Sequence, residues 1–238
     1  MPVFKTLSDD DPLLLTSPLI RSVLKTAQYI EENGGIGLTP SGAFNRKFVL
    51  WAAGEFNWPG YSEEELFRVN KVLNEWDFPP VGDIHELLLG LKLARRYKGK
   101  LLLSKAGKSL TAAPGALFTE LVPAFLFSVD HGAHLRRDSH LLGNWDIFLN
   151  VINVEADHGA TRSALRETLY GAHDASGSIH DSISSDLYVT VLRPLCWAGL
   201  LKEDDGNSRF DEAFTKTELW RRTLRLNTDR DLKFRVIH

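Results

Sequence analysis

A run of cations in the middle of the chain is the part of the sequence with the clearest chemistry. Between Leu87 and Thr119 there is no Asp or Glu, although the whole chain has a net charge of −3. Ordinary protein surfaces mix both signs of charge, so this stretch predicts a local positive patch that can bind phosphate groups. The cations of the stretch are Lys92, Arg95, Arg96, Lys98, Lys100, Lys105 and Lys108.

The same cations also have a purely structural explanation. Basic residues near the C-terminus of a helix interact favourably with its dipole, and charges on a hairpin keep an edge strand from pairing with other chains. The sequence therefore leaves two interpretations open. The cations either bind nucleic acid, or they form the solvated rim of a helix and a hairpin.

A second candidate surface lies in the sequence FNWPGY, which contains Phe56, Trp58 and Tyr61. Pro and Gly predict a loop here. Aromatic side chains on a loop are typical of a surface that contacts another protein. We therefore expect these three residues to be exposed and to bind a partner, whereas the other Trp residues of the chain are expected in the core.

Other reactive residues do not form a recognisable catalytic pattern. His131, His134 and His140 are close in sequence, but no Cys or carboxylate accompanies them at the spacing of a metal site. Cys196 lies in an apolar run and is expected to be buried and unreactive. No Gly-x-Ser-x-Gly, phosphate-binding loop, dinucleotide fingerprint or His-Glu-x-x-His motif is present. The sequence predicts a non-enzymatic protein without metal or cofactor.

The composition predicts a soluble globular protein. Of the 238 residues, 43% are hydrophobic and 25% are charged, and no run is long and apolar enough to span a membrane. The first residues include three consecutive Asp where a signal peptide would be basic and apolar. Together with the single Cys, this favours a cytoplasmic location and no membrane partner.

Helix caps indicate where the first helices begin. Ser17 followed by Pro18 predicts a helix that runs to Glu32 and stops at the sequence NGG. Ser62 with Glu65 is the pattern of a capping box and predicts another helix start.

The cations themselves are predicted on a helix and a hairpin. Asp83 with Glu86 repeats the capping pattern, and the helix that follows is expected to run as far as Arg95 and Arg96. Gly99 can then reverse the chain into the apolar stretch KLLL.

One pattern recurs along the chain. The sequences IGLTPSG and KLLLSKAGKSL both contain a short strand, then Thr39 or Ser104 as a cap, two residues, Gly and a helix. A looser third copy has Thr215 as the cap, with Glu218 in place of the Gly, and it follows a helix predicted over residues 182–197.

The order helix, helix, hairpin, cap and helix resembles the winged helix-turn-helix superfamily. The pair LTPSGAFNRKFV and ELLLGLKLARRYKGKLLLSKAGKSL is also similar to the C-terminal region of a family of plasmid- and phage-associated bacterial proteins. The resemblance implies a mainly α fold with short β-hairpins, built from tandem winged-helix-like modules. The expected boundaries are 1–60 for the first module, 61–125 for the second, 126–160 for a helical connector and 161–238 for the third.

Two functions are compatible with this fold. The first is double-stranded DNA binding, as in a regulator of transcription carried by a mobile element. In such a module the helix before the hairpin enters the major groove. This helix is expected to expose His85, Glu86, Lys92, Arg95 and Arg96, and any reading of bases is expected from Arg95 or Arg96. The alternative is a protein-interaction adaptor or inhibitor that uses winged-helix units as scaffold, since one fold serves both roles.

Overall fold

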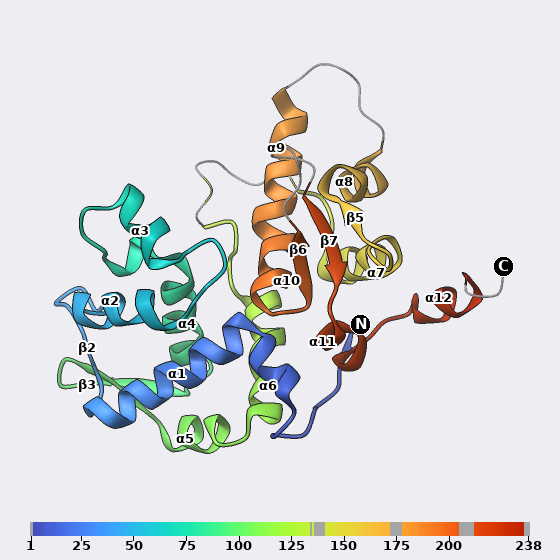
Figure 1. Cartoon of the computed structure of the whole chain (residues 1–238). Coiled ribbons are helices and arrows are strands. Elements are labelled where there is room, and N and C mark those ends of the chain that lie inside the picture. The colour runs from blue at the N-terminus through green and yellow to red at the C-terminus, as the bar shows by residue number, and fades with distance from the viewer. Residues whose placement is uncertain (1, 134, 136–140, 172–177, 205–211, 236–238) are drawn as a thin grey trace. The chain divides into compact units, whose positions relative to one another are not determined.

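The chain forms two compact units. The computed structural model describes residues 2–133, 135, 141–171, 178–204 and 212–235. Residues 6–125 form one unit, called here the N-terminal unit, and residues 1–5 with 126–238 form the C-terminal unit. Both units are mainly helical with short antiparallel sheets, which confirms the predicted fold class (Figure 1).

The N-terminal unit contains both of the first two expected modules. The boundary expected between residues 60 and 61 falls inside this unit. Its elements are η1 (Pro12–Thr16), α1 (Pro18–Asn33), β2 (Ile36–Gly37), α2 (Arg46–Glu55), α3 (Glu63–Val69), η2 (Glu75–Asp77), α4 (Pro79–Gly90), β3 (Ala94–Tyr97), β4 (Lys100–Leu103), α5 (Lys105–Thr111) and α6 (Pro114–Ser128), whose last residues continue into the C-terminal unit.

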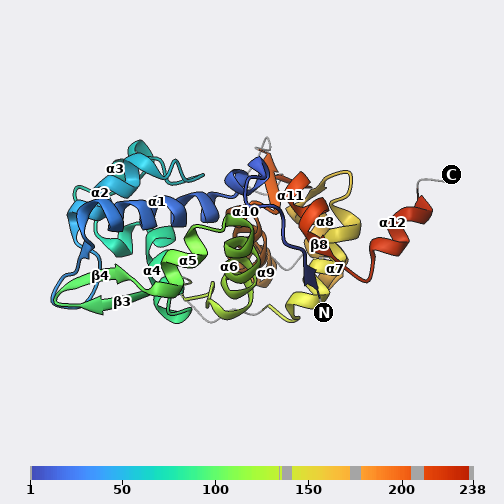
Figure 2. The same ribbon diagram turned by 90° about the horizontal axis from the view of Figure 1, so that it is seen from below.

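A three-stranded antiparallel sheet joins the two expected modules. Its strand order is β2-β4-β3, with Ile36 opposite Leu101 and Ala94 opposite Leu103. Ile36 and Leu101 are fully buried, so the pairing also fixes the core face of the sheet. The hairpin of β3 and β4 lies alongside α1 (Figure 2).

Three of the predicted helix starts are confirmed. The Ser17 hydroxyl accepts the Ile20 N–H at 3.3 Å, and the Ser104 hydroxyl accepts the Gly107 N–H at 2.9 Å. The capping box that opens α3 is also formed. Each cap satisfies a backbone donor that would otherwise have no partner in its helix.

The helix expected after Thr39 begins later, at Arg46. Asn45 is its cap, because the Asn45 side chain accepts the Phe48 N–H at 3.0 Å. Thr39 closes a turn instead, in which its hydroxyl accepts the Ala43 N–H at 3.1 Å. Thr39 and Asn45 are both residue types that cap helices. Thr39 stabilises the turn, and Asn45 caps the helix.

The helix before the hairpin begins and ends earlier than predicted. It begins at Pro79, not at Asp83, because two consecutive prolines suit the first helical positions, where no N–H partner is needed. Asp83 is buried inside α4. The helix ends at Gly90, so Arg95 and Arg96 belong to β3 and not to a helix.

The C-terminal unit has its own sheet and helices. The boundary expected between residues 160 and 161 divides its strand β5. Its elements are β1 (Val3–Phe4), α7 (Trp145–Glu155), β5 (Ala160–Thr161), α8 (Arg162–Tyr170), α9 (Ser178–Leu187), the π-helical segment η3 (Tyr188–Leu192), α10 (Arg193–Trp197), β6 (Leu201–Asp204), β7 (Ala213–Lys216), α11 (Glu218–Thr223), β8 (Leu224–Arg225) and α12 (Asp229–Arg235).

Both units have the same order of elements. In each, a helix leads to a two-residue strand, further helices and a hairpin, and a helix follows the hairpin. The sheet orders are β2-β4-β3 and β5-β7-β6, so the strand before the helices pairs with the last strand of the hairpin in both. The sequence pattern had revealed the hairpins but not β5.

Two predictions for the third module need correction. The helix expected over residues 182–197 contains a π-helical turn before Pro194, which places this proline at the start of α10 and avoids a clash in the preceding turn. The cap of the last predicted helix is Thr217, whose hydroxyl accepts the Trp220 N–H at 3.1 Å. Thr215 lies in strand β7.

A buried polar network stabilises the C-terminal unit. The Lys216 ammonium donates to the backbone oxygen of Asn153 at 2.8 Å and pairs with Asp157 at 2.7 Å. The Trp220 indole donates to the Asn153 side chain at 3.1 Å, and Arg221 pairs with Asp157 at 2.9 Å. The network therefore connects α7 with β7 and α11.

Replacing Asp157 by Asn should lower the free energy of unfolding by about 1–3 kcal/mol at neutral pH. Lys216, whose side chain is 2% exposed, would lose its carboxylate partner. Partial burial opposes ionisation of Asp157, but hydrogen bonds from Lys216 and Arg221 outweigh it and lower the pKa of this carboxyl below 3.8.

The effect should depend on pH. Because the folded state has the lower pKa, the stabilisation from Asp157 is complete above about pH 3.8 and is lost as the pH falls through the folded value. Urea unfolding of the parent and the variant should show a difference at pH 7 that shrinks near pH 3. An unchanged difference would show that the Asp157 carboxylate does not stabilise the unit.

Candidate nucleic-acid interface

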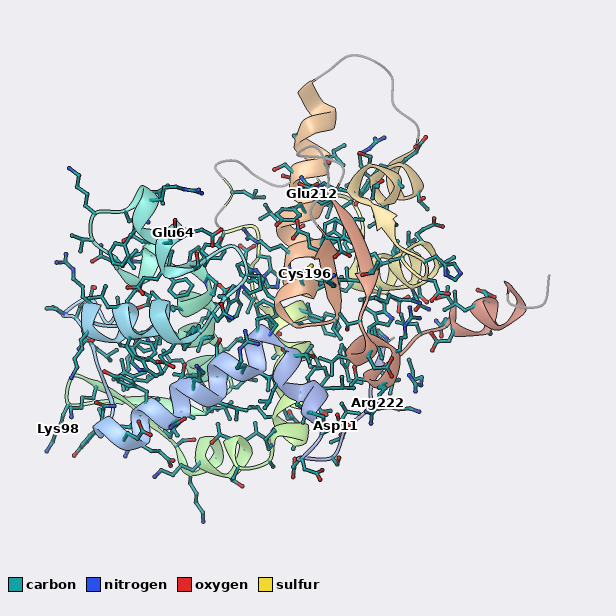
Figure 3. The ribbon with its side chains drawn as sticks, in the orientation of Figure 1. Asp11, Glu64, Lys98, Cys196, Glu212 and Arg222 are labelled. Atoms are coloured by element: carbon teal, nitrogen blue, oxygen red, sulfur yellow. The ribbon has the colours of Figure 1, made fainter. Side chains whose placement is uncertain are left out.

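The hairpin of β3 and β4 carries most of the predicted cations. Its two-residue turn consists of Lys98 and Gly99, with φ angles of 47° and 71°. Positive φ at both positions is typical of the tight turns that suit the twist of a hairpin. Lys98 therefore stands at the tip and projects away from the rest of the N-terminal unit (Figure 3).

The cations of the predicted positive patch do not all lie on one face of the hairpin. Side chains alternate between the two faces of a strand, so Arg95 and Arg96 point to opposite faces of the hairpin. Arg95 shares the outer face with Tyr97, whereas Arg96 shares its face with the buried Ala94.

Tyr97 is the centre of the outer face. Its ring is 47% exposed, and the Arg95 guanidinium lies 5.1 Å and the Lys98 ammonium 5.3 Å from the ring centroid. Lys100 is paired with Tyr97 across the hairpin and lies on the same face. Contacts between cations and the ring hold two positive groups at the surface without neutralising them.

Arg96 lies on the opposite face, over the turn that precedes α2. A Cβ atom placed on Gly42 would be 3.3 Å from the Arg96 Cζ. The absence of a side chain at Gly42 thus leaves room for the guanidinium against the turn.

Two of the seven cations have structural partners at the end of α1. The Lys100 ammonium donates to the backbone oxygen of Gly34 at 3.2 Å, and Lys108 lies 3.6 Å from Glu31. A cation at the C-terminus of a helix interacts favourably with its dipole. The structural explanation therefore accounts for part of the cationic run.

The remaining cations have no carboxylate partner within the described ranges. Lys92 and Lys105 stand at the base of the hairpin, where the Ser104 hydroxyl donates to the Lys92 backbone oxygen at 2.8 Å. Both are exposed. The cations of this group are Lys92, Arg95, Arg96, Lys98 and Lys105.

Helix α4 cannot read bases in the way predicted. His85 is 5% exposed, stacks on Phe44 with ring centroids 4.0 Å apart, and lies 2.7 Å from Glu75. Glu86 is the only exposed charged residue of α4. The cations lie on the hairpin and around it, not on this helix.

The aromatic loop is not an exposed surface. Phe56 is 0% and Trp58 is 2% exposed, and Tyr61 is half-buried. Arg21 of α1 donates to the backbone oxygens of Phe56 and Asn57, both at 3.2 Å, and so holds the loop against the core. The prediction that these aromatics are exposed is therefore wrong for Phe56 and Trp58.

Comparison with known proteins places the chain in a family. Residues 15–116 match the family model described as the Y4jL N-terminal domain, and residues 135–218 match the y4jL C-terminal domain. An uncharacterized protein y4jL of Sinorhizobium fredii (strain NBRC 101917 / NGR234) is 39% identical over 171 residues, which cover 71% of this chain and 77% of the relative. The chain belongs to the y4jL family.

The two y4jL domains correspond to the two compact units. The first match lies within residues 6–125, and the second lies within residues 126–238. No solved structure matches the chain. The y4jL family thus has a two-domain organisation, while the winged-helix resemblance and the mobile-element setting stay predictions.

The y4jL N-terminal domain exposes a tryptophan that sequence reasoning placed in the core. Trp76 is 80% exposed and lies in η2, between Asn74 and Asp77. The Asp77 carboxylate accepts the Asn74 N–H at 2.8 Å, which forms the capping box of this short turn. The pattern Asn-x-x-Asp was the available signal for this capped turn, but it does not indicate that Trp76 is exposed.

Charged residues of the y4jL C-terminal domain pair with residues of the same domain. Arg162 is 6% exposed, pairs with Glu212 at 2.6 Å and lies 4.4 Å from the Tyr188 ring centroid. The Tyr188 hydroxyl donates to Glu203 at 3.1 Å, and burial first, then the nearby carboxylate, raises the pKa of this tyrosine. The acidic hairpin of this domain therefore binds its own helices.

The remaining sequence candidates lie only partly within the described residues. His131 is buried beside Trp145, and His134 and His140 lie outside the described residues. Burial raises the pKa of the Cys196 thiol, as an unreactive cysteine requires. No group of three metal-binding side chains occurs in the part of the chain that the structure describes.

No single described helix is long and apolar enough to cross a membrane. Only α5 and α6 taken together reach that length and composition, and they are bent by 113° at their junction.

Proposed function

We propose that the N-terminal unit binds double-stranded DNA as a winged-helix module whose hairpin, rather than helix α4, contacts the phosphate backbone. The order of elements supports the module, since the short strand, the helices and the hairpin follow each other as in that superfamily. On this interpretation the C-terminal unit is a second module of the same type that does not contact DNA.

The observation that carries the proposal is that the exposed cations on both faces and at the tip of the hairpin have no carboxylate partner among the residues that the structure describes. Arg95 faces outward, Arg96 faces the opposite side, and Lys98 occupies the turn. The hairpin is the outer part of a three-stranded sheet, because β2 pairs with β4, so we expect it to lie along the DNA backbone and not to enter a groove as a free ribbon. The exposed cations at its tip and along its strands can then contact phosphates.

The protein is expected to bind DNA chiefly through phosphates. The hairpin offers no side-chain amide, and the exposed charge of α4 is the negative Glu86. Phosphate contacts position a protein on the duplex and carry little sequence information. We therefore propose a non-enzymatic DNA-binding protein with weak sequence preference, acting as a regulator or as a structural protein of DNA.

Fluorescence anisotropy with a labelled duplex of about 25 base pairs tests the proposal. At about 50 mM salt the protein should bind duplexes of unrelated sequence with similar affinity, and unlabelled duplex should compete. Absence of binding at that salt concentration would reject the proposal. A protein partner recovered from a nuclease-treated lysate, together with absence of DNA binding, would favour the adaptor alternative.

A further inference from the structure

The most exposed aromatic side chain has no role in the proposed duplex contact. Trp76 is 80% exposed, the largest fraction of any described Phe, Tyr or Trp. Large apolar side chains on a protein surface often mark a binding site when they occur together. Val69 and Val72, at 77% and 47%, are exposed in the same stretch of chain.

The backbone around Trp76 is firmly held. Glu75 is 8% exposed, lies 2.7 Å from His85 and also accepts the Phe44 N–H. Asp77 closes the turn from the other side. Trp76 is thus an exposed ring on a fixed element, which loses little conformational entropy when it binds a ligand.

Charges of both signs lie close to Trp76 in the sequence, because Asp77 follows it directly and cations lie on both neighbouring segments. Arg46 donates to the Asn74 side chain at 3.0 Å, and Lys47 is exposed beside it at the start of α2. Between Phe67 and Trp76 the exposed charges are Arg68 and Lys71, because the one acid of this stretch, Glu75, is buried. Arg46 is the cation that the structure ties to the turn of Trp76, and it can contact a phosphate next to a base that stacks on the ring.

The same turn connects this region with the hairpin. Residues 39–45 carry Gly42, over which Arg96 lies, and Phe44, whose N–H is bound by Glu75. The environment of Trp76 and one face of the hairpin thus share one turn of the N-terminal unit. A polyanion on the hairpin can continue toward Trp76.

We propose that Trp76 stacks on an unpaired nucleobase while the hairpin holds the adjoining duplex. The preferred ligand is then a junction between double- and single-stranded DNA rather than a blunt duplex. The proposal rests on the proposed function. An indole ring stacks on any base, and cations beside it contact the backbone of the single strand, so the preference is for structure and not for sequence.

The test compares two DNA ligands by anisotropy: a blunt duplex, and the same duplex with a short oligo-dT overhang. The parent protein should bind the overhang ligand about 5- to 150-fold more tightly, as expected for one stacked base. Trp76→Ala should abolish this preference and leave blunt-duplex affinity unchanged, and Trp76→Phe should retain most of it. Leu15→Ala, at a half-exposed apolar residue of the same unit, is the matched control and should change neither affinity.

The outcomes separate this inference from the proposed function. Equal affinity of the parent protein for both ligands would overturn the role of Trp76 while leaving duplex binding in place. Absence of binding to either ligand would reject the proposed function itself. If Trp76→Ala instead abolishes self-association or capture of a protein partner, with the overhang preference intact, Trp76 serves a protein contact and the inference is wrong.

Discussion

Reversing three hairpin charges, with Arg95, Arg96 and Lys98 all replaced by Glu, is expected to weaken duplex binding by about 100-fold or more at low salt. The three side chains occupy both faces and the tip of the hairpin. The variant removes three phosphate contacts and adds three repulsive charges at the same places. Anisotropy with the labelled duplex measures the loss.

A matched variant controls for net charge. Lys5, Lys202 and Arg230 are exposed cations of the C-terminal unit, and replacing all three by Glu changes the net charge of the protein by the same amount. This control should bind DNA with an affinity within a few-fold of the parent. Equal loss in both variants would mean that total charge, and not the hairpin, determines binding.

Gly107→Ala is expected to destabilise the N-terminal unit by about 2–3 kcal/mol. A Cβ atom at Gly107 would lie 1.9 Å from the Leu93 backbone oxygen, which no side chain can accommodate without moving the backbone. The glycine of the recurring Ser-x-x-Gly pattern therefore permits α5 to pack closely against the start of the hairpin. The midpoint of chemical unfolding measures the loss.

Gly82→Ala is the control for this substitution. Gly82 lies inside α4, and a Cβ there would have no neighbour within 4 Å. The change should stabilise the unit by about 0.4–1 kcal/mol, because alanine restricts the unfolded chain and favours a helix. If both variants had the same stability, the close approach at Leu93 would have no energetic importance.

The parts of the fold that depend on neighbouring residues were predictable from sequence. Ser17, Ser62 and Ser104 cap helices because each bonds a donor three residues along. The turn at Gly99 and the second strand of the hairpin were also predictable, whereas the first strand was expected to be the end of a helix. These interactions form within a few residues of sequence, so the pattern contains the information.

Features that depend on distant residues were not predictable. The aromatics Phe56 and Trp58 are buried because Arg21 holds the loop from a helix far away in sequence. Likewise, the pairing of β2 with β4 makes one unit of two expected modules. The sequence pattern at these places describes a loop and a strand but does not indicate their partners.

The candidate site was predicted in composition but not in shape. The cations of the hairpin are exposed, as expected, but Arg95 and Arg96 were expected on a helix and lie on opposite faces of a strand. The end of α4 at Gly90 determines this difference. Trp76 was missed because an aromatic residue next to buried positions is more often part of the core.

The salt dependence of duplex binding tests the central claim most directly. With about five phosphate contacts, a plot of log K against log salt concentration should have a slope near −4.5, and Lys98→Ala should make it less steep by about 0.9. A slope near zero, or the same slope for the parent and Lys98→Ala, would contradict a hairpin that binds phosphate.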